Sequence, residues 1–226
     1  MPVSEAVATP TRWWAEYAWL PDRPEPTPGV LIEAIDGRIT AVTEGAAPPP
    51  DAVRLPGLTL PAFANAHSHA FHRALRGATV GRGDFWSWRD RMYAVAERLD
   101  PDHYLALARA VYAELALAGV ACVGEFHYLH HAPGGARYAD PNAMSAALVT
   151  AAAEAGIRIT LLDTCYLTAS VDGAPLTGAQ RRFGDGDAAR WAERVAAFAP
   201  DADTARVGAA VHSVRAVPAE QVPEVV

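Results

Sequence analysis

The sequence predicts an α/β protein, the N-terminal half of a (β/α)8 TIM-type barrel preceded by a small β-rich segment. Two observations predict this fold. Long alanine- and leucine-rich stretches alternate with short apolar stretches after residue 57, and the short stretches are continuous apolar runs. Continuous runs are expected of parallel strands covered on both faces. We therefore expect a β-rich segment at residues 1–57 and about four β-α units at residues 58–226.

The β-rich segment contains a predicted hairpin. Residues 29–35 (GVLIEAI) and 38–45 (RITAVTEG) are separated by Asp36 and Gly37. Asp-Gly favours a two-residue turn between antiparallel strands.

The β-α units are predicted from apolar runs and from residues that mark helix ends. Pro101 follows Asp100 as at a capped helix start, and Gly119 and Gly156 lie where helices should end. Helices are predicted at residues 101–118, 141–155 and 186–199, and strands at residues 58–67, 120–126, 157–165 and 206–213.

Four such units are half of a barrel, which takes about 250 residues when complete. An open half would have unpaired strand edges, so we expect the chain to be the N-terminal part of a longer protein. A small open α/β sheet, complete in itself, is the alternative.

The composition excludes several classes of partner. The chain has 226 residues, of which 51% are hydrophobic, and its net charge is -7. All 19 basic residues are arginines. An acidic chain without a basic run does not fit nucleic acid or an anionic membrane, which favours a small-molecule partner. The absence of a long apolar run and of a signal-peptide pattern predicts a cytoplasmic protein.

The strongest chemical signal is the sequence Asn65-Ala66-His67-Ser68-His69 at the end of a predicted strand. Residues two apart on a strand point to the same side, so both imidazoles can reach one ion at the carboxyl end of the barrel. Neutral imidazole suits zinc. We predict His67 and His69 as metal ligands; packed or surface histidines are the alternative. Iron remains open as the native metal, because imidazole serves both.

Several segments together resemble one family, the formimidoylglutamate deiminases of the amidohydrolase superfamily. The strand-end HxH resembles the superfamily as a whole. The narrower resemblance rests on AEYAWLPD, NAHSHAFHRALRG, DFWSWRDRMY, GEFHYLHH, RRFGDGD and VHSVRA, which run in order from about Trp13 to Ala216.

The resemblance implies a zinc-dependent hydrolase of histidine degradation that converts N-formimino-L-glutamate to N-formyl-L-glutamate and ammonia. The superfamily's two-metal members commonly use a carboxylated lysine, and this chain has no lysine, so one zinc is expected. The substrate carries two carboxylates, which an acidic protein must hold through local cations and hydrogen bonds. The resemblance also implies a homodimer at full length.

The resemblance assigns substrate-binding residues as well. His212 and Arg215 in VHSVRA match the family's carboxylate clamp, and Tyr128 would add a hydroxyl donor. His72 stands where the family has glutamine, and Arg89 is a further candidate on a loop over the site. Without the motif, Arg215 could simply cap a helix or form an ion pair, and Tyr128 could be core packing. His127, His130 and His131 are interpreted as scaffold or loop residues, because adjacent side chains on a strand point to opposite faces.

The family's remaining zinc ligands and proton-transfer residues come from later strands and do not occur here. Beyond the metal ligands, no catalytic residue is predicted, and this chain alone is expected to be inactive. Two alternatives stay open. One is an amidohydrolase-superfamily deaminase of another substrate, such as a purine; the other is a non-catalytic fragment that binds a metal or a partner.

Overall fold

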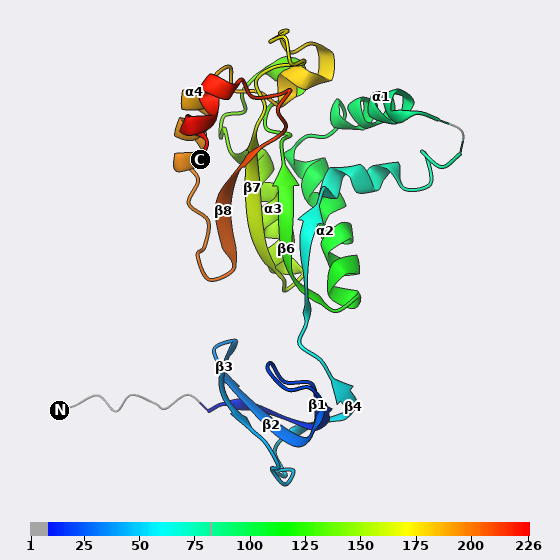
Figure 1. Ribbon diagram of the computed structural model, residues 1–226, viewed down its shortest axis with the longest axis vertical. Helices are drawn as coiled ribbons and strands as arrows, with labels where there is room; N and C mark the ends of the chain where they lie inside the picture. The colour runs from blue at the N-terminus through cyan, green and yellow to red at the C-terminus, as the bar shows by residue number, and fades with distance from the viewer. Residues whose placement is uncertain (1–8, 82) are drawn as a thin grey trace, which may run out of the picture. The chain divides into compact units, whose positions relative to one another are not determined.

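The computed structural model describes residues 9–81 and 83–226, which divide between Ala62 and Phe63 into two compact units. Each unit is built around one sheet, and Figure 1 shows both. Among the described residues, no helix is long and apolar enough to cross a membrane.

The N-terminal unit is a sheet with strand order β3-β2-β1-β4. Its strands are β1 (Thr11–Ala18), β2 (Thr27–Ile35), β3 (Arg38–Thr43) and β4 (Val53–Thr59). The predicted hairpin is confirmed, because β2 and β3 pair antiparallel and Ile35 lies opposite Arg38. Asp36 and Gly37 both have positive φ, 49° and 73°, as a two-residue turn of this hand requires. Strands β1 and β4, which pair parallel, were not predicted.

The strand predicted at residues 58–67 is wrong in its bounds. The structure ends β4 at Thr59 and begins β5 (Phe63–Ser68) only after Pro61. Proline has no N–H to donate to a strand ladder, which explains the break between two strands that belong to different units.

The second unit, residues 63–226, contains a parallel sheet in the sequential order β5-β6-β7-β8. This is the arrangement of the first four strands of a TIM-type barrel, and we call it the barrel unit. Its remaining strands are β6 (Val120–His127), β7 (Arg158–Cys165) and β8 (Ala205–Val211). Its helices are α1 (Phe85–Ala96), α2 (Pro101–Leu117), α3 (Ala143–Glu154) and α4 (Ala188–Ala196). Short 3₁₀ turns are η1 (Ala70–Leu75), η2 (Pro133–Gly135), η3 (Gly178–Arg182) and η4 (Ala219–Glu224).

The three predicted helices are present, and two of them, α2 and α4, begin at capping side chains. Asp100 accepts a hydrogen bond from the His103 backbone N–H at 2.8 Å, and Pro101 occupies the first turn of α2. Asp187 caps α4 in the same way through the Arg190 N–H at 2.8 Å. Helix α4 therefore begins at Ala188, two residues later than predicted.

The barrel sheet is covered by helices on one face only. Along β6 and β7, Val123, Ile159 and Leu161 are buried in the cluster that includes α2 and α3, whereas Cys122 and Phe126 alternate with them and are half-buried. Coverage on both faces is expected of the strands of a complete barrel, and a half barrel with one open face agrees with the predicted fold. The open face is the one toward which the barrel interior would lie.

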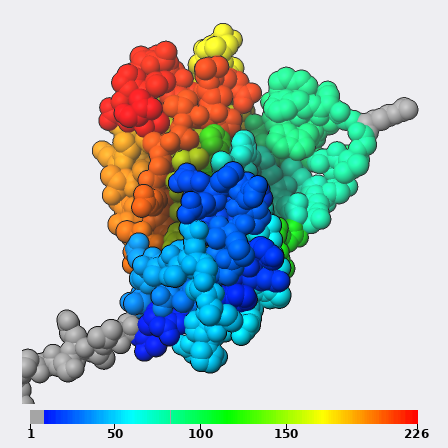
Figure 2. All heavy atoms as spheres, turned by 60° about the horizontal axis from the view of Figure 1, so that its bottom comes forward, coloured from blue at the N-terminus to red at the C-terminus, as the bar shows by residue number. Residues whose placement is uncertain are grey.

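Helix α1 was not predicted, and it lies at one side of the barrel unit, where its residues form a lobe in Figure 2. It packs against η1 and η3. The fully buried Arg182 ties the end of α1 to the body, because its guanidinium donates to the carbonyls of Ala96, Leu99 and His131. Arginine can make several such bonds at once from one planar group.

Candidate active site

His67 and His69 lie at the carboxyl end of β5 with their Nε2 atoms 2.9 Å apart. His69 Nδ1 is 3.2 Å from the carbonyl oxygen of Phe126. A carbonyl can only accept, so Nδ1 carries the proton and Nε2 offers its lone pair toward His67. Two imidazole nitrogens this close together could bind the same ion. The two imidazoles therefore fit a metal.

Strand β6 holds this end of β5 in place. Glu125 is fully buried and accepts a hydrogen bond from the Ala70 backbone N–H at 2.6 Å, directly after His69. Burial raises the pKa of Glu125 to about 7. Gly124 faces Ala66, where a Cβ atom would come within 3.2 Å of the Ala66 carbonyl oxygen. The strands approach closely here because residue 124 has no side chain.

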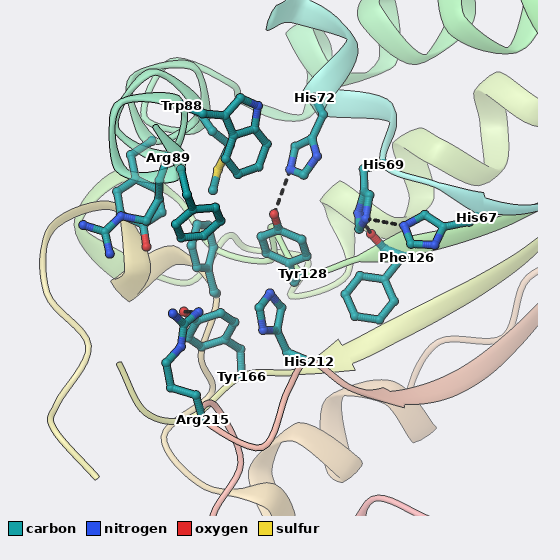
Figure 3. A pocket seen from close by; sticks show the side chains of 14 residues that line it. His67, His69, His72, Trp88, Arg89, Phe126, Tyr128, Tyr166, His212 and Arg215 are labelled. Atoms are coloured by element: carbon teal, nitrogen blue, oxygen red, sulfur yellow. Dashed lines mark hydrogen bonds between the residues drawn. The ribbon is translucent and has the colours of Figure 1, made fainter. Parts of the chain in front are cut away.

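A pocket of about 430 Å³ opens beside the two histidines, and all seven residues predicted from the sequence line it. They are His67, His69, His72, Arg89, Tyr128, His212 and Arg215. Figure 3 shows them together with Trp88, Phe126 and Tyr166. The structure thus brings the predicted residues to one place, and their individual roles remain predictions.

His72 and Tyr128 lie in the middle of the pocket. The Tyr128 hydroxyl and His72 Nε2 are 2.8 Å apart, so η1 and the segment after β6 are joined by a hydrogen bond (Figure 3). Burial, with smaller contributions from His69, His212 and His67, lowers the pKa of His72 to about 3. His72 is therefore a neutral imidazole at physiological pH.

Arg89 and Arg215 lie at the end of the pocket away from His67 (Figure 3). Arg89 extends from α1, not from a loop as predicted, and its guanidinium lies 4.5 Å from the Trp86 ring. The nearest carboxylate oxygen recorded for it belongs to the exposed Asp90, at 3.9 Å. Arg215 donates to the Tyr166 hydroxyl at 3.5 Å. The Nε atoms of both arginines are buried without a partner among the described residues.

Two guanidinium groups with unpaired N–H donors can bind an anion. A buried donor without a partner is costly, and a ligand carboxylate would satisfy it with a charge-assisted hydrogen bond. The lining residues that the structure describes contain no carboxylate that could do this instead.

His212 follows β8 and lies between the two ends of the pocket. Its ring is 4.3 Å from that of Tyr166, and its Nδ1 is 3.3 Å from the Ser213 hydroxyl. Burial, followed by the charges of Arg215 and His69, lowers the pKa of His212 to about 4. Neutral His212 can offer either a donor or an acceptor to a ligand.

Sequence reasoning missed part of the lining. The residues concerned are Phe85, Trp88, Met92, Tyr93, Phe126, Tyr166 and Phe183, which are aromatic or apolar. One signal was available for Tyr166, because it directly follows a predicted strand, where a barrel presents functional side chains. The others resemble ordinary core residues.

A second histidine cluster lies on the opposite face of the sheet. His127, His130 and Asp163 place three possible ligand atoms within 4.8 Å and could hold a metal. However, Asp163 already accepts from Arg194 at 2.8 and 2.9 Å and from the Trp191 indole at 2.9 Å. A divalent cation there would lie beside the guanidinium charge. We therefore interpret the group as a buried ion-pair network.

This network predicts a pH-dependent stability. Burial and the Arg194 charge lower the pKa of His130 to about 4. The pKa of this histidine in the unfolded chain is about 6.5. Between pH 6.5 and 4 the unfolded state therefore binds more protons than the folded state, and the free energy of unfolding decreases as the pH is lowered. From this group alone, the free energy of unfolding should fall by about 2 kcal/mol between pH 7 and pH 5.

Thermal melting at a series of pH values measures this effect. His130→Gln should flatten the dependence between pH 7 and 5, whereas His103→Gln, a change at an exposed histidine, should leave it as it is. An unchanged slope in His130→Gln would contradict the assignment.

Comparisons with known proteins identify the class. No family model matches the chain. Among solved structures, an amidohydrolase from Brucella melitensis is similar with a TM-score of 0.85 and 34% identity, over 95% of this chain and 49% of that one. A triazine hydrolase from Arthrobacter aurescens is similar with a TM-score of 0.76 at 18% identity, over 95% of this chain and 49% of that one. The atrazine chlorohydrolase TrzN of that organism, solved with zinc, has a TM-score of 0.72 at 21% identity, over 95% and 48%. The barrel unit and its N-terminal sheet therefore have the amidohydrolase fold.

A comparison of sequences identifies a more specific relationship than the shared fold. The chain is 40% identical over 179 residues to formimidoylglutamate deiminase of Pseudomonas aeruginosa, which covers 77% of this chain and 40% of that protein. The resemblance predicted from the sequence motifs is confirmed. The chain spans less than half the length of this curated relative and about half the length of the amidohydrolase structures.

Proposed function

We propose that this chain supplies the first two metal ligands and the carboxylate-binding end of a zinc-dependent deiminase. The reaction is hydrolysis of N-formimino-L-glutamate to N-formyl-L-glutamate and ammonia. One observation carries the proposal: a convergent pair of imidazoles and two arginines with unpaired Nε atoms occupy opposite ends of a single pocket (Figure 3). The name of the 40% identical relative supports the same substrate.

The two ends suit a long substrate with different chemistry at each end. N-formimino-L-glutamate carries an amidine group and two carboxylates, so the arginines would bind the carboxylates while the amidine carbon faces His67 and His69. A bound zinc would lower the pKa of a water molecule and so supply hydroxide. Water adds to the formimino carbon, the bond from that carbon to the terminal nitrogen breaks, and ammonia leaves.

The residues of this chain bind and orient the substrate. His69 is held by the Phe126 carbonyl in the tautomer that offers Nε2 to a metal, which fixes the ring before a ligand arrives. The Tyr128 hydroxyl and the neutral His72 can hydrogen-bond the substrate near the reacting group. Since the described lining contains no carboxylate to act as a general base, we expect this chain by itself to release no ammonia.

Zinc binding tests the metal end. The purified chain should bind one zinc per molecule only weakly, because two imidazoles are an incomplete ligand set, and His69→Ala should weaken this by at least about tenfold, because half of the described imidazole pair is lost. Isothermal titration and metal analysis measure it. His103→Ala is the control, since this exposed histidine lies outside the pocket lining. Equal zinc affinity in both variants would show that the metal binds elsewhere, with the His127 cluster as the next site to test.

Ligand binding tests the substrate. The chain should bind N-formyl-L-glutamate and not guanine; the reverse would favour a purine deaminase. Binding of neither ligand would favour a non-catalytic role. Zinc-dependent ammonia release from N-formimino-L-glutamate by this chain alone would overturn the expected inactivity.

A further inference from the structure

Tyr166 lies at the arginine end of the pocket, directly after β7. Tyr166 is only 2% exposed, and the centre of its ring lies 4.3 Å from that of His212 and 5.5 Å from that of Phe183. Figure 3 shows Tyr166 beside Arg215. The sequence motifs assign it no role.

Two donors approach the Tyr166 hydroxyl oxygen. The Gln180 side-chain nitrogen is 3.3 Å away, and an Arg215 guanidinium nitrogen is 3.5 Å away. The orientation of the Gln180 amide is set by its other end, because its carbonyl oxygen accepts from the Thr177 backbone N–H at 3.4 Å in a capping box. Gln180 must therefore present its NH₂ group to Tyr166.

Neither neighbour can accept a hydrogen bond from Tyr166 at these atoms. A guanidinium and an amide NH₂ group only donate, so the hydroxyl oxygen uses its two lone pairs to accept. The hydroxyl hydrogen then remains to be donated, and no acceptor for it is recorded among the described residues. Tyr166 lines the pocket, so a ligand bound there is the acceptor that remains for this hydrogen.

We propose that Tyr166 donates its O–H to the substrate carboxylate that pairs with Arg215, with Gln180 and Arg215 orienting the hydroxyl. This inference rests on the proposed function, because it assumes a dicarboxylate ligand. The Tyr166 hydroxyl would add a neutral hydrogen-bond donor to the charged donors Arg89 and Arg215. Tyr166 would then help to determine which ligands bind. A ligand without a carboxylate at this position would leave a buried O–H unpaired, which disfavours neutral ligands.

Binding of glutarate to the full chain tests the proposal, because glutarate carries two carboxylates and no reacting group. Tyr166→Phe removes only the hydroxyl, and its dissociation constant for glutarate should rise about tenfold, as expected for one hydrogen bond to a charged group. Tyr104→Phe is the matched control, because it removes from α2 a buried hydroxyl that has no hydrogen-bond partner among the described residues and lies outside the pocket lining. Zinc affinity and melting temperature should stay unchanged in Tyr166→Phe, which separates a ligand contact from a structural role.

The outcomes are distinct. If the parent chain binds glutarate and Tyr166→Phe binds it equally well, the role of Tyr166 is overturned and the proposed function stands. If the parent binds zinc but no glutarate, the dicarboxylate substrate is overturned together with this inference. Should Tyr166→Phe fail to fold, Gln180→Met provides a second test, since losing one orienting donor should weaken glutarate binding about threefold. An unchanged affinity in Gln180→Met would then overturn the inference.

Discussion

Replacing Arg194 by methionine should lower the free energy of unfolding of the barrel unit by about 3–5 kcal/mol, the range for breaking a buried ion pair. Arg194 is 4% exposed and binds Asp163 and Asp185, which are 1% and 7% exposed. Burial opposes ionisation of Asp163, but His130 and Arg194 outweigh it and lower its pKa. Without the guanidinium, two carboxylates would remain buried with only histidines and the Trp191 indole as partners.

Urea denaturation of the parent and of Arg194→Met measures the loss. Arg190→Met is the control one turn earlier on α4, because the Arg190 side chain is 63% exposed and pairs with the exposed Asp187. An exposed pair contributes about 0–1 kcal/mol, so the control should unfold almost as the parent does. Similar losses in both variants would show that the buried network does not stabilise the fold.

Replacing Arg215 by methionine should raise the dissociation constant for glutarate by about 10- to 100-fold. Among the described residues, the Arg215 Nε has no hydrogen-bond partner and the Tyr166 hydroxyl is the one side-chain partner of its guanidinium, so a ligand carboxylate would be its main anionic partner. Hydrogen bonds to charged groups are worth about 1.5–3 kcal/mol each, which sets this range. Arg215→Lys should recover part of the affinity, because it restores the charge but not the planar pair of donors.

Isothermal titration with glutarate measures this effect, and Arg206→Met, at an exposed arginine of β8, should bind as the parent does. Loss of glutarate binding should leave zinc binding intact, since His67 and His69 lie at the other end of the pocket. If glutarate affinity survives in Arg215→Met, the carboxylate clamp inferred from VHSVRA is wrong.

The parallel half-barrel and the pairing of His67 with His69 are predictable from local sequence patterns. Apolar runs following alanine-rich helices specify strands β6 to β8, and one short spacing, His67-Ser68-His69, places two imidazoles at the same strand end. Both signals lie within a few residues, so tertiary contacts are not needed to interpret them.

Other elements depend on contacts between distant residues. Helix α1 begins with the aromatic residues Phe85 and Trp86, which are poor helix formers, and it is stabilised by the Asp84 cap and by Arg182 at its end. For this reason the sequence predicts a loop around Arg89, which in the structure lies on α1. Strand β4 contains Pro56, which a strand tolerates at a sheet edge, where β4 in fact lies.

That Arg89 and Arg215 line one pocket could be predicted from the sequence only through motif resemblance. Arg89 and Arg215 are far apart in the chain, and nothing in their local patterns brings them together. The orientation of the Tyr166 hydroxyl depends on Gln180 and Arg215, which come from two further segments. These contacts between distant residues result from tertiary packing, and the spacing of residues in the sequence does not predict them.

The two ends of the pocket differ in what competes with a ligand there. An imidazole binds a metal only through an unprotonated ring nitrogen, so protons compete with a metal at the end formed by His67 and His69. A guanidinium binds an anion through N–H groups that it already carries, so no such competition arises at the end formed by Arg89 and Arg215. A metal and an anionic ligand would therefore be taken up independently, each at its own end of one pocket.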